Sequence, residues 1–359
     1  MEHDEGATQL LAALLSGLGT ASGSLLDGSG GGLLAWHWWE ARHLLAAEAT
    51  GSPRTLLSER RPDLTVEDGY RVQWCGAAIR VAQGARIAGH KVGLTSAAMQ
   101  QQMGIGEPDS GILLDTMAVP DGGLVDPAAM ISPRVEAEIA FLLRYDLAGP
   151  GVGEDQARAA IAGAKIALEI IDSRFGLPGI VLADSVADNA ACARFVLGEQ
   201  VPIGGPDGLD LCAEELTVYV GGHPVERGHG REILGDPIRS VVWLTRRLAG
   251  FGLGIRAGDI VLAGAVHASI PLPAGQAVTA SSPRLGQVSL DVADSGSGAP
   301  SPLPPLSPPP SPAPWALTPK PFMGSPTVRP SPTRKPNTPG YPCCGPRWTG
   351  SVTPYPPGS

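Results

Sequence analysis

The sequence predicts an α+β domain that is dominated by β-sheet and has a small helical N-terminal part. Three observations support this class. Short apolar segments of strand length recur between residues 86 and 292, few segments have the spacing of a long helix, and no repeat occurs at a fixed period. The chain of 359 residues is long enough to bury one sizeable core.

The N-terminal part is expected to become helical after an irregular start. Residues 1–36 contain a Gly/Ser-rich run and are expected to form a poorly structured extension. Residues 37–60 have helical spacing, which Gly51-Ser52-Pro53 interrupts. Thr65 can cap the next helix because Asp68 follows three residues later, as in a capping box, and this helix should run to about residue 83.

The following region is expected to combine several strands with two further helices. Apolar patterns predict strands over 86–94, 133–145, 165–172, 216–220, 259–265 and 287–292. Helical spacing predicts helices over 154–163 and 237–249. Pro and Gly predict a turn over 107–111. We therefore expect one folded domain over residues 37–293.

The last part of the chain, residues 294–359, has a different composition. It holds 21 of the 36 prolines and, after Asp294, no acidic residue. Because it has almost no apolar periodicity, it cannot form a packed core. We expect a disordered Pro-rich tail.

Charge, hydropathy and cysteine use restrict the possible partners and compartment. The formal net charge of −9 argues against binding to nucleic acid through phosphate-neutralising surfaces. No apolar run reaches the roughly 20 residues that a membrane span needs. The five cysteines include no CxxC pair, and the acidic start Met-Glu-His-Asp-Glu is unlike a secretory signal. We expect a cytoplasmic protein without a nucleic-acid or membrane partner.

Three glutamates stand out because they occur within apolar strands. Glu136 and Glu138 are two residues apart and therefore share one face of the strand over 133–145. Glu169 lies between apolar residues in the strand over 165–172. Spacing alone leaves two interpretations open. The three carboxylates could form an oxygen-only site for Mg²⁺ or Mn²⁺, or the first two could lie on a solvated edge while Glu169 pairs with Lys165 or Arg174.

Two further charged residues are candidates for proton transfer. Lys91 lies in an apolar strand between Gly89 and Gly93, where its pKa could be lowered for acid–base chemistry. The alternative is an interior lysine whose ammonium reaches the surface. Asp109 follows Pro108 and is either an acid of the site or a residue that stabilises a turn.

Six segments occur in an order and spacing that resemble a known family. They span residues 89–96, 100–104, 108–113, 133–140, 167–174 and 184–190. Together they resemble the 2-oxopent-4-enoate hydratase and 4-oxalocrotonate decarboxylase family, which belongs to the fumarylacetoacetate hydrolase superfamily. The resemblance covers roughly residues 40–293. It implies a sheet-rich fold like the fumarylacetoacetate hydrolase C-terminal domain, in a homo-oligomer that associates with another enzyme of the same pathway.

The resemblance also implies which residues form the site. Glu136, Glu138 and Glu169 match the family's ligands of a divalent cation, expected to be Mg²⁺ or Mn²⁺. Lys91 and Asp109 match its acid–base pair. The residues expected to contact the substrate are Leu94, Ser110, Ser185 and Asn189.

The implied activity is a metal-dependent hydro-lyase of aromatic-compound breakdown. It would add water to 2-hydroxypenta-2,4-dienoate, the enol of 2-oxopent-4-enoate, and give 4-hydroxy-2-oxopentanoate. The first alternative is a 4-oxalocrotonate (2-oxo-3-hexenedioate) decarboxylase that uses the same cation. Further alternatives are an acylpyruvate-type C–C hydrolase, for which no water-activating His–Glu pair is evident, and an inactive binding homologue.

The chain departs from the family pattern near residue 190. The family often has Ser after the segment Val-Ala-Asp-Asn-Ala, where this chain has Ala191 and Cys192. A hydroxyl that could contact the substrate is therefore absent. His267 follows the last-but-one expected strand and is interpreted as a loop histidine without an assigned role.

Overall fold

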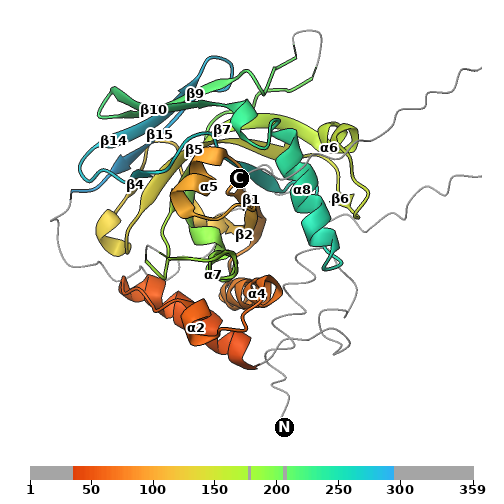
Figure 1. Cartoon of the computed structure of the whole chain (residues 1–359). Helices are drawn as coiled ribbons and strands as arrows, with labels where there is room; N and C mark the ends of the chain where they lie inside the picture. Colours follow the sequence, from red (N-terminus) through yellow and green to blue (C-terminus); the bar gives the residue numbers. More distant parts are fainter. Residues whose placement is uncertain (1–34, 177–178, 205–207, 295–359) are drawn as a thin grey trace, which may run out of the picture. The chain divides into compact units, whose positions relative to one another are not determined.

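The structure is a computed structural model of the chain and describes residues 35–176, 179–204 and 208–294 (Figure 1). The predicted N-terminal extension, apart from its last two residues, lies outside the described residues, and so does the predicted Pro-rich tail apart from Asp294. Both expectations therefore stay predictions.

The N-terminal part of the described region is helical, as predicted. Its helices are α2 (Ala35–Thr50), α3 (Leu57–Arg60) and α4 (Val66–Ala82). α2 is followed by Gly51, whose φ of +61° carries no steric penalty for glycine. The predicted capping box of α4 is confirmed, because Asp68 N donates to Thr65 Oγ1 at 3.1 Å and Thr65 N donates to Asp68 Oδ2 at 3.3 Å.

The main sheet has eight strands in the order β2-β1-β12-β5-β7-β8-β3, with β13 paired to β5. Its strands are β1 (Ile87–Gly93), β2 (Asp109–Leu114), β3 (Ala118–Val119), β5 (Arg134–Leu143), β7 (Ile161–Ile171), β8 (Cys192–Leu197), β12 (Ile260–Ala265) and β13 (Ile270–Pro271). β1 runs parallel to β12, and the central pairs β12–β5, β5–β7 and β7–β8 are antiparallel. The central strands are buried almost throughout, which explains their long apolar runs.

A second sheet has five strands in the order β10-β9-β14-β15-β4. They are β4 (Gly123–Val125), β9 (Glu215–Val220), β10 (His223–His229), β14 (Ala277–Ser282) and β15 (Gly286–Val292). β14 and β15 lie against β7 of the main sheet, and the apolar side chains between the two sheets belong to one continuous core. The short strands β6 (Leu147–Ala148) and β11 (Gly254–Ile255) form a separate pair.

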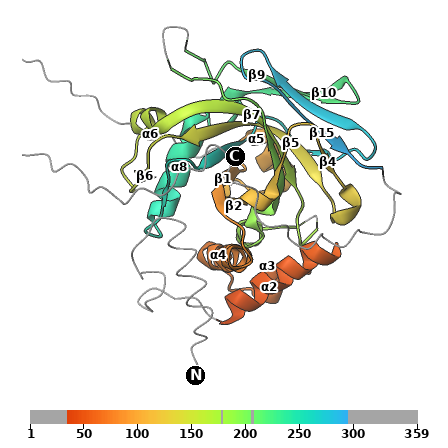
Figure 2. The same ribbon diagram turned by 180° about the vertical axis from the view of Figure 1, so that it is seen from behind.

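Several helices pack against strands of the main sheet. α8 (Ile238–Ala249) packs on β12 and on α6 (Glu154–Ala160), while α4 contacts α2, β2 and α7 (Leu182–Ala187). A further helix, α5 (Ala97–Met103), follows β1. Figures 1 and 2 both show α4 between α2 and the part of the sheet that contains β2. The α+β prediction is thus confirmed, and no helix among the described residues has the length and apolar character of a membrane span.

Two predicted boundaries were wrong for identifiable reasons. The turn expected over 107–111 is instead the beginning of β2, because Asp109 and Gly111 pair in register with Gly93 and Lys91 of β1. Asp, Ser and Gly have low strand propensity, but the pairing overrides it. The helix expected to reach residue 163 ends at Ala160, because Ile161 already pairs with Leu143 of β5.

Candidate active site

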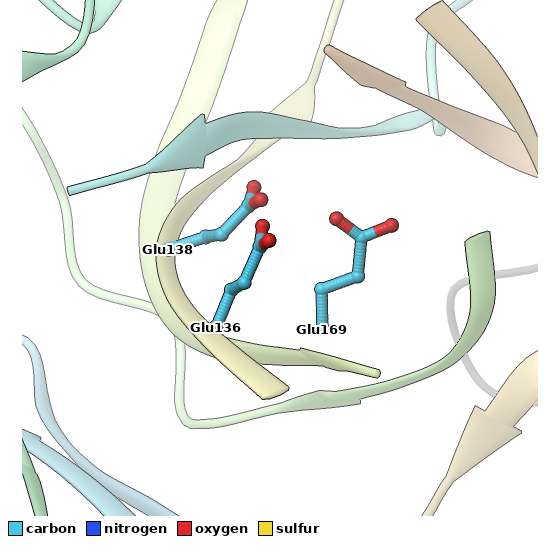
Figure 3. A group of neighbouring side chains, drawn as sticks. All are labelled: Glu136, Glu138 and Glu169. Atoms are coloured by element: carbon cyan, nitrogen blue, oxygen red, sulfur yellow. The ribbon is translucent and has the colours of Figure 1, made fainter. Parts of the chain in front are cut away.

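The three glutamates converge on one face of the main sheet (Figure 3). Glu136 lies directly opposite Glu169 in the antiparallel pair β5–β7, and Glu138 follows two residues along β5 on the same face. One carboxylate oxygen from each residue lies within 4.8 Å of the other two. The predicted same-face pair and the isolated acid of the next strand therefore form one cluster.

The cluster is buried and lacks enough hydrogen-bond donors. Glu138 and Glu169 are fully buried, and Glu136 is 3% exposed. Gly264 N donates to Glu138 Oε2 at 2.8 Å, but Glu136 Oε1, Glu138 Oε1 and both Glu169 oxygens have no hydrogen-bond partner. Buried carboxylates are costly unless a donor or a cation compensates them. An oxygen-only set of this kind fits a hard divalent cation.

The alternative interpretation of these glutamates is wrong. None of the three lies on a solvated edge. Lys165 Nζ donates to the Gly198 carbonyl at 3.0 Å, and Arg174 Nε pairs with Asp188 Oδ1 at 2.6 Å. Neither residue is the partner of Glu169.

Burial changes the proton affinity of the cluster. It raises the pKa of Glu136 to about 8, with the negative charge of Glu169 as the next cause. The pKa of Glu138 is raised well above its ordinary range by burial and then by the charges of Glu169 and Glu136. Without a cation, the site therefore retains protons near neutral pH.

We expect Mg²⁺ binding to strengthen with pH. The folded protein without cation holds a proton on Glu136 up to about pH 8, whereas the unfolded chain loses it near pH 4.5. Raising the pH through this window therefore destabilises the cation-free protein, and a cation that replaces the proton removes this loss. The Mg²⁺ association constant should rise at least about tenfold per pH unit from pH 6 to pH 8, because the cation displaces the proton of Glu136 and any proton that Glu138 retains.

Calorimetric titration with Mg²⁺ at pH 6, 7 and 8 checks this expectation, with the rise in melting temperature at saturating Mg²⁺ as a second measurement. Glu136→Gln is the matched control, because it cannot exchange a proton at this position and should lower the slope of the logarithm of the association constant against pH by about one. A pH-independent association constant in the unmodified protein would contradict the assignment.

Lys91 is buried beside the cluster instead of reaching the surface. It is 4% exposed, and its Nζ donates to the Ala190 carbonyl at 2.9 Å and lies 3.4 Å from Glu169 Oε2. Burial by itself would lower the pKa of Lys91, but Glu169, Asp109 and the other two glutamates together raise it above its ordinary value. The expected lowering of this pKa was therefore wrong for the protein without cation.

Asp109 and Lys91 approach each other over Gly93. Asp109 begins β2 opposite Gly93 of β1, and Ser185 Oγ donates to Asp109 Oδ2 at 2.5 Å. Asp109 Oδ1 is buried without a hydrogen-bond partner. A Cβ atom at Gly93 would lie 3.0 Å from Lys91 Nζ and closer still to Asp109 Oδ1. The absence of a side chain at Gly93 therefore makes room for both charged groups.

The four residues expected to contact the substrate lie in three segments around Asp109 and Lys91. Leu94 directly follows β1 and has a φ of +56°, and Ser185 lies in α7 beside Asp109. Ser110 Oγ is 3.0 Å from the Tyr70 hydroxyl. The Asn189 amide accepts from Ile112 N at 2.7 Å and donates to Ile112 O at 3.0 Å. Their contact with a substrate stays a prediction.

Cys192, at the departure from the family pattern, is buried beside Glu169. Burial, followed by the negative charge of Glu169, raises the pKa of the Cys192 thiol well above its ordinary value. In the protein without cation, the thiol therefore stays protonated.

Some functional contacts were not predicted from the sequence. The Ala190 carbonyl holds Lys91, but a backbone carbonyl has no residue-type signal. His267 lies in a loop as expected, yet its buried ring is part of the structure: Ala137 N donates to Nε2 at 3.2 Å, and Nδ1 donates to Ala268 O at 2.8 Å. Burial lowers the pKa of His267, which keeps the ring neutral for this arrangement.

The family can be assigned by comparison with known proteins. The model of the fumarylacetoacetate hydrolase C-terminal family matches residues 94–293, which is more than half of the chain and includes the three glutamates. The chain belongs to this family. The fold and the family predicted from the sequence are therefore confirmed.

Within the fumarylacetoacetate hydrolase family, the chain is similar to named hydratases and to a named decarboxylase. It is 39% identical to a 2-hydroxyhexa-2,4-dienoate hydratase of Comamonas testosteroni over 64% of this chain and 87% of that protein. It is 37% identical to a 2-keto-4-pentenoate hydratase of Paraburkholderia xenovorans over 66% and 87%. A solved 4-oxalocrotonate decarboxylase of Pseudomonas putida G7, complexed with magnesium and adipate, is 34% identical and covers 72% of this chain and 97% of its own, with a TM-score of 0.68.

Proposed function

We propose that this protein is a divalent-metal-dependent hydro-lyase that adds water to 2-hydroxypenta-2,4-dienoate and gives 4-hydroxy-2-oxopentanoate. The observation that carries the proposal is the buried cluster of Glu136, Glu138 and Glu169, in which four oxygens accept no hydrogen bond and Glu169 forms an ion pair with Lys91. The hydratases among its relatives support the choice of reaction.

Glu136, Glu138 and Glu169 would hold the cation, which we propose to be Mg²⁺ or Mn²⁺. When bound, a divalent cation supplies Lewis-acid polarisation of the carboxylate and 2-oxo oxygens of a 2-oxo acid. The three glutamates carry up to three negative charges, and Lys91 adds one positive charge. A divalent cation brings this group close to neutrality, so that an anionic substrate can approach.

The proposed reaction needs two proton transfers, and the site contains two groups that can perform them. The water oxygen bonds to C4, while one proton from water and one from the 2-hydroxyl end on C3 and C5. Asp109 Oδ1 has no partner and can accept a proton, while the Ser185 hydroxyl fixes the other oxygen. Lys91 Nζ is charged and can donate one.

The second candidate is a 4-oxalocrotonate decarboxylase, supported by the similarity to the solved enzyme of that name. This reaction breaks the bond to the distal carboxylate, releases carbon dioxide and needs one proton in its place. The same three glutamates and the same proton donor would serve. The two activities differ in the groups that surround the far end of the substrate.

An ultraviolet assay tests the proposal. The purified protein is mixed with 2-hydroxypenta-2,4-dienoate, and the loss of dienol absorbance is followed with Mg²⁺, with Mn²⁺ and after chelation. Turnover that needs the cation, with 4-hydroxy-2-oxopentanoate as product, is the expected result. Carbon dioxide release from 4-oxalocrotonate without hydration of the dienoate would favour the second candidate. Metal binding without turnover of either compound would indicate an inactive homologue.

The expected partner is a small-molecule substrate of this type. We also propose a homo-oligomer, and an association with another enzyme of the same pathway. Sedimentation velocity of the purified protein tests the first of these, because a monomeric mass would contradict it.

A further inference from the structure

The turn over 189–191 has unusual backbone geometry and provides the carbonyl that binds Lys91. Asn189, Ala190 and Ala191 have φ angles of +55°, +51° and +58°, in the left-handed region that disfavours residues with a Cβ atom. None of the three is glycine, so the surrounding contacts must impose this conformation. The turn connects α7 to β8.

The turn determines where Lys91 points. The Ala190 carbonyl accepts the hydrogen bond from Lys91 Nζ at 2.9 Å, and no other hydrogen bond of this ammonium occurs among the described residues. The Asn189 carbonyl lies close to Gly111 of β2, where a Cβ atom would come within 2.5 Å of it. A relaxation of the turn would therefore move the acceptor that holds the ammonium beside Glu169.

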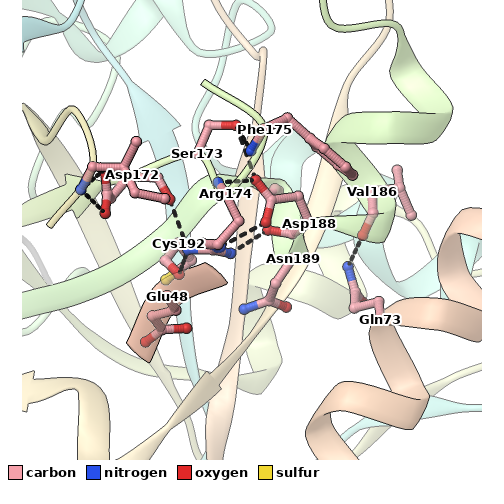
Figure 4. A network of polar contacts seen from close by, with 12 residues as sticks. Glu48, Gln73, Asp172, Ser173, Arg174, Phe175, Val186, Asp188, Asn189 and Cys192 are labelled. Atoms are coloured by element: carbon pink, nitrogen blue, oxygen red, sulfur yellow. Dashed lines mark hydrogen bonds and ion pairs between the residues drawn. The ribbon is translucent and has the colours of Figure 1, made fainter. Parts of the chain in front are cut away.

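Arg174 joins the two ends of this turn (Figure 4). Its guanidinium is buried, with the residue 3% exposed. Nη2 donates to the Asp188 carbonyl before the turn, and Nη1 donates to the Cys192 carbonyl after it at 3.2 Å. Nη1 also donates to the Asp172 carbonyl at 2.7 Å.

The carboxylate of Asp188 orients Arg174 in turn. Asp188 Oδ1 accepts from Arg174 Nε at 2.6 Å, and Oδ2 accepts from Arg174 N at 2.8 Å and from Ser173 Oγ at 3.0 Å. A backbone hydrogen bond also links the turn to the segment before Arg174, because Asp172 N donates to the Ala191 carbonyl at 2.8 Å. The planar guanidinium of Arg174 carries N–H donors that point in different directions, so it can bind the Asp188 and Cys192 carbonyls at the same time.

We propose that Arg174 is a positioning residue of the reaction, which acts by holding the turn over 189–191 so that the Ala190 carbonyl fixes Lys91. The proposal rests on the proposed function, in which Lys91 transfers a proton. Arg174 itself contacts neither the glutamate cluster nor, in this proposal, the substrate. Its loss should therefore affect turnover more than substrate or cation binding.

The test is Arg174→Lys, which keeps the positive charge but cannot bind the Asp188 and Cys192 carbonyls at the same time. At a temperature well below the melting point of the variant, we expect kcat to fall at least tenfold, because a displacement of about 1 Å can cost 10²-fold. KM for 2-hydroxypenta-2,4-dienoate and the half-saturating Mg²⁺ concentration should change less than about threefold. The matched control is Arg60→Lys, which removes a similar bidentate contact to the buried Glu40 in the N-terminal helices and should keep kcat within about twofold.

A rescue experiment separates positioning from simple destabilisation. Glycine has no Cβ penalty in the left-handed region, so adding Ala191→Gly to Arg174→Lys should recover at least about threefold in kcat. The single Ala191→Gly protein completes the double-mutant cycle. If Arg174→Lys does not fold, Asp188→Asn is the second variant. It weakens the contacts that orient Arg174 with less disruption and should show the same selective fall in kcat.

Unchanged kcat in folded Arg174→Lys, or parallel losses in kcat, KM and Mg²⁺ binding, would overturn the proposal. A crystal structure of this variant gives a test that does not depend on activity: the turn should leave the left-handed region and the Lys91–Ala190 contact should lengthen. If the unmodified protein proves inactive as a hydratase, the proposed function fails, but this structural outcome still decides whether Arg174 holds the turn.

Discussion

Replacing Lys91 by Ala should lower turnover by about 10²–10⁴-fold, the usual contribution of a general acid–base group. The change removes the buried ammonium that lies 3.4 Å from Glu169 Oε2 and faces the same space as Asp109 Oδ1. Mg²⁺ binding should persist, or tighten, because a positive charge next to the glutamates is lost. Steady-state kinetics of the dienoate assay and calorimetric titration with Mg²⁺ measure the two effects.

Two further variants distinguish this role from a structural one. Lys91→Arg should not rescue, because the larger guanidinium does not fit where Gly111 already approaches the Lys91 stem, and it stays protonated at any working pH. Glu136→Gln should instead weaken the cation first, with partial recovery in excess Mg²⁺. If Lys91→Ala keeps near-normal turnover, Lys91 is not the proton donor, and Asp109 becomes the leading candidate for both transfers.

Gly93→Ala should lower turnover by about 10²-fold or more, although it adds only one methyl group. The new Cβ would lie 3.0 Å from Lys91 Nζ and closer to Asp109 Oδ1. Neither group can move away freely, because Ser185 holds Asp109 and the Ala190 carbonyl holds Lys91. The backbone of Gly93 is not in the left-handed region, so the collision alone accounts for the loss.

Gly76→Ala is the matched control for this substitution. Gly76 lies within α4, and a Cβ atom there would meet no other atom within 4 Å. Alanine should stabilise this helix by roughly 0.5–1 kcal/mol and leave turnover unchanged. Melting temperatures of both variants must accompany the kinetics. Normal turnover in Gly93→Ala would mean that Asp109 and Lys91 do not need their present separation.

Much of the fold and the charged part of the site could be predicted from the sequence. Glu136 and Glu138 share a face because strands alternate, and Glu169 is conspicuous because a carboxylate within an apolar strand needs compensation. Thr65 and Asp68 indicated the start of α4 because capping is a local interaction. The shared face of Glu136 and Glu138, the burial of Glu169 and the cap of α4 follow from such short-range rules, and the structure confirms these three.

The parts that could not be predicted depend on contacts between distant segments. β2 was missed because Asp109-Ser110-Gly111 has the composition of a turn, and only its pairing with β1 makes it a strand. The direction of the Lys91 pKa shift was wrong because it depends on how many carboxylates gather around the ammonium, and these come from β2, β5 and β7. The left-handed turn at Ala190 has no glycine to indicate it.

The pairing of β5 with β7 would let a bound cation influence the folding of the chain. Glu136 faces Glu169 only when these strands are aligned as observed. A slip of one residue would place Leu168 or Ile170 opposite Glu136 and turn the Glu169 side chain to the other face. A mispaired chain could not bind the cation with three carboxylates, whereas the native alignment could. Mg²⁺ during refolding would therefore favour the native alignment by mass action and select against chains that have closed this sheet incorrectly.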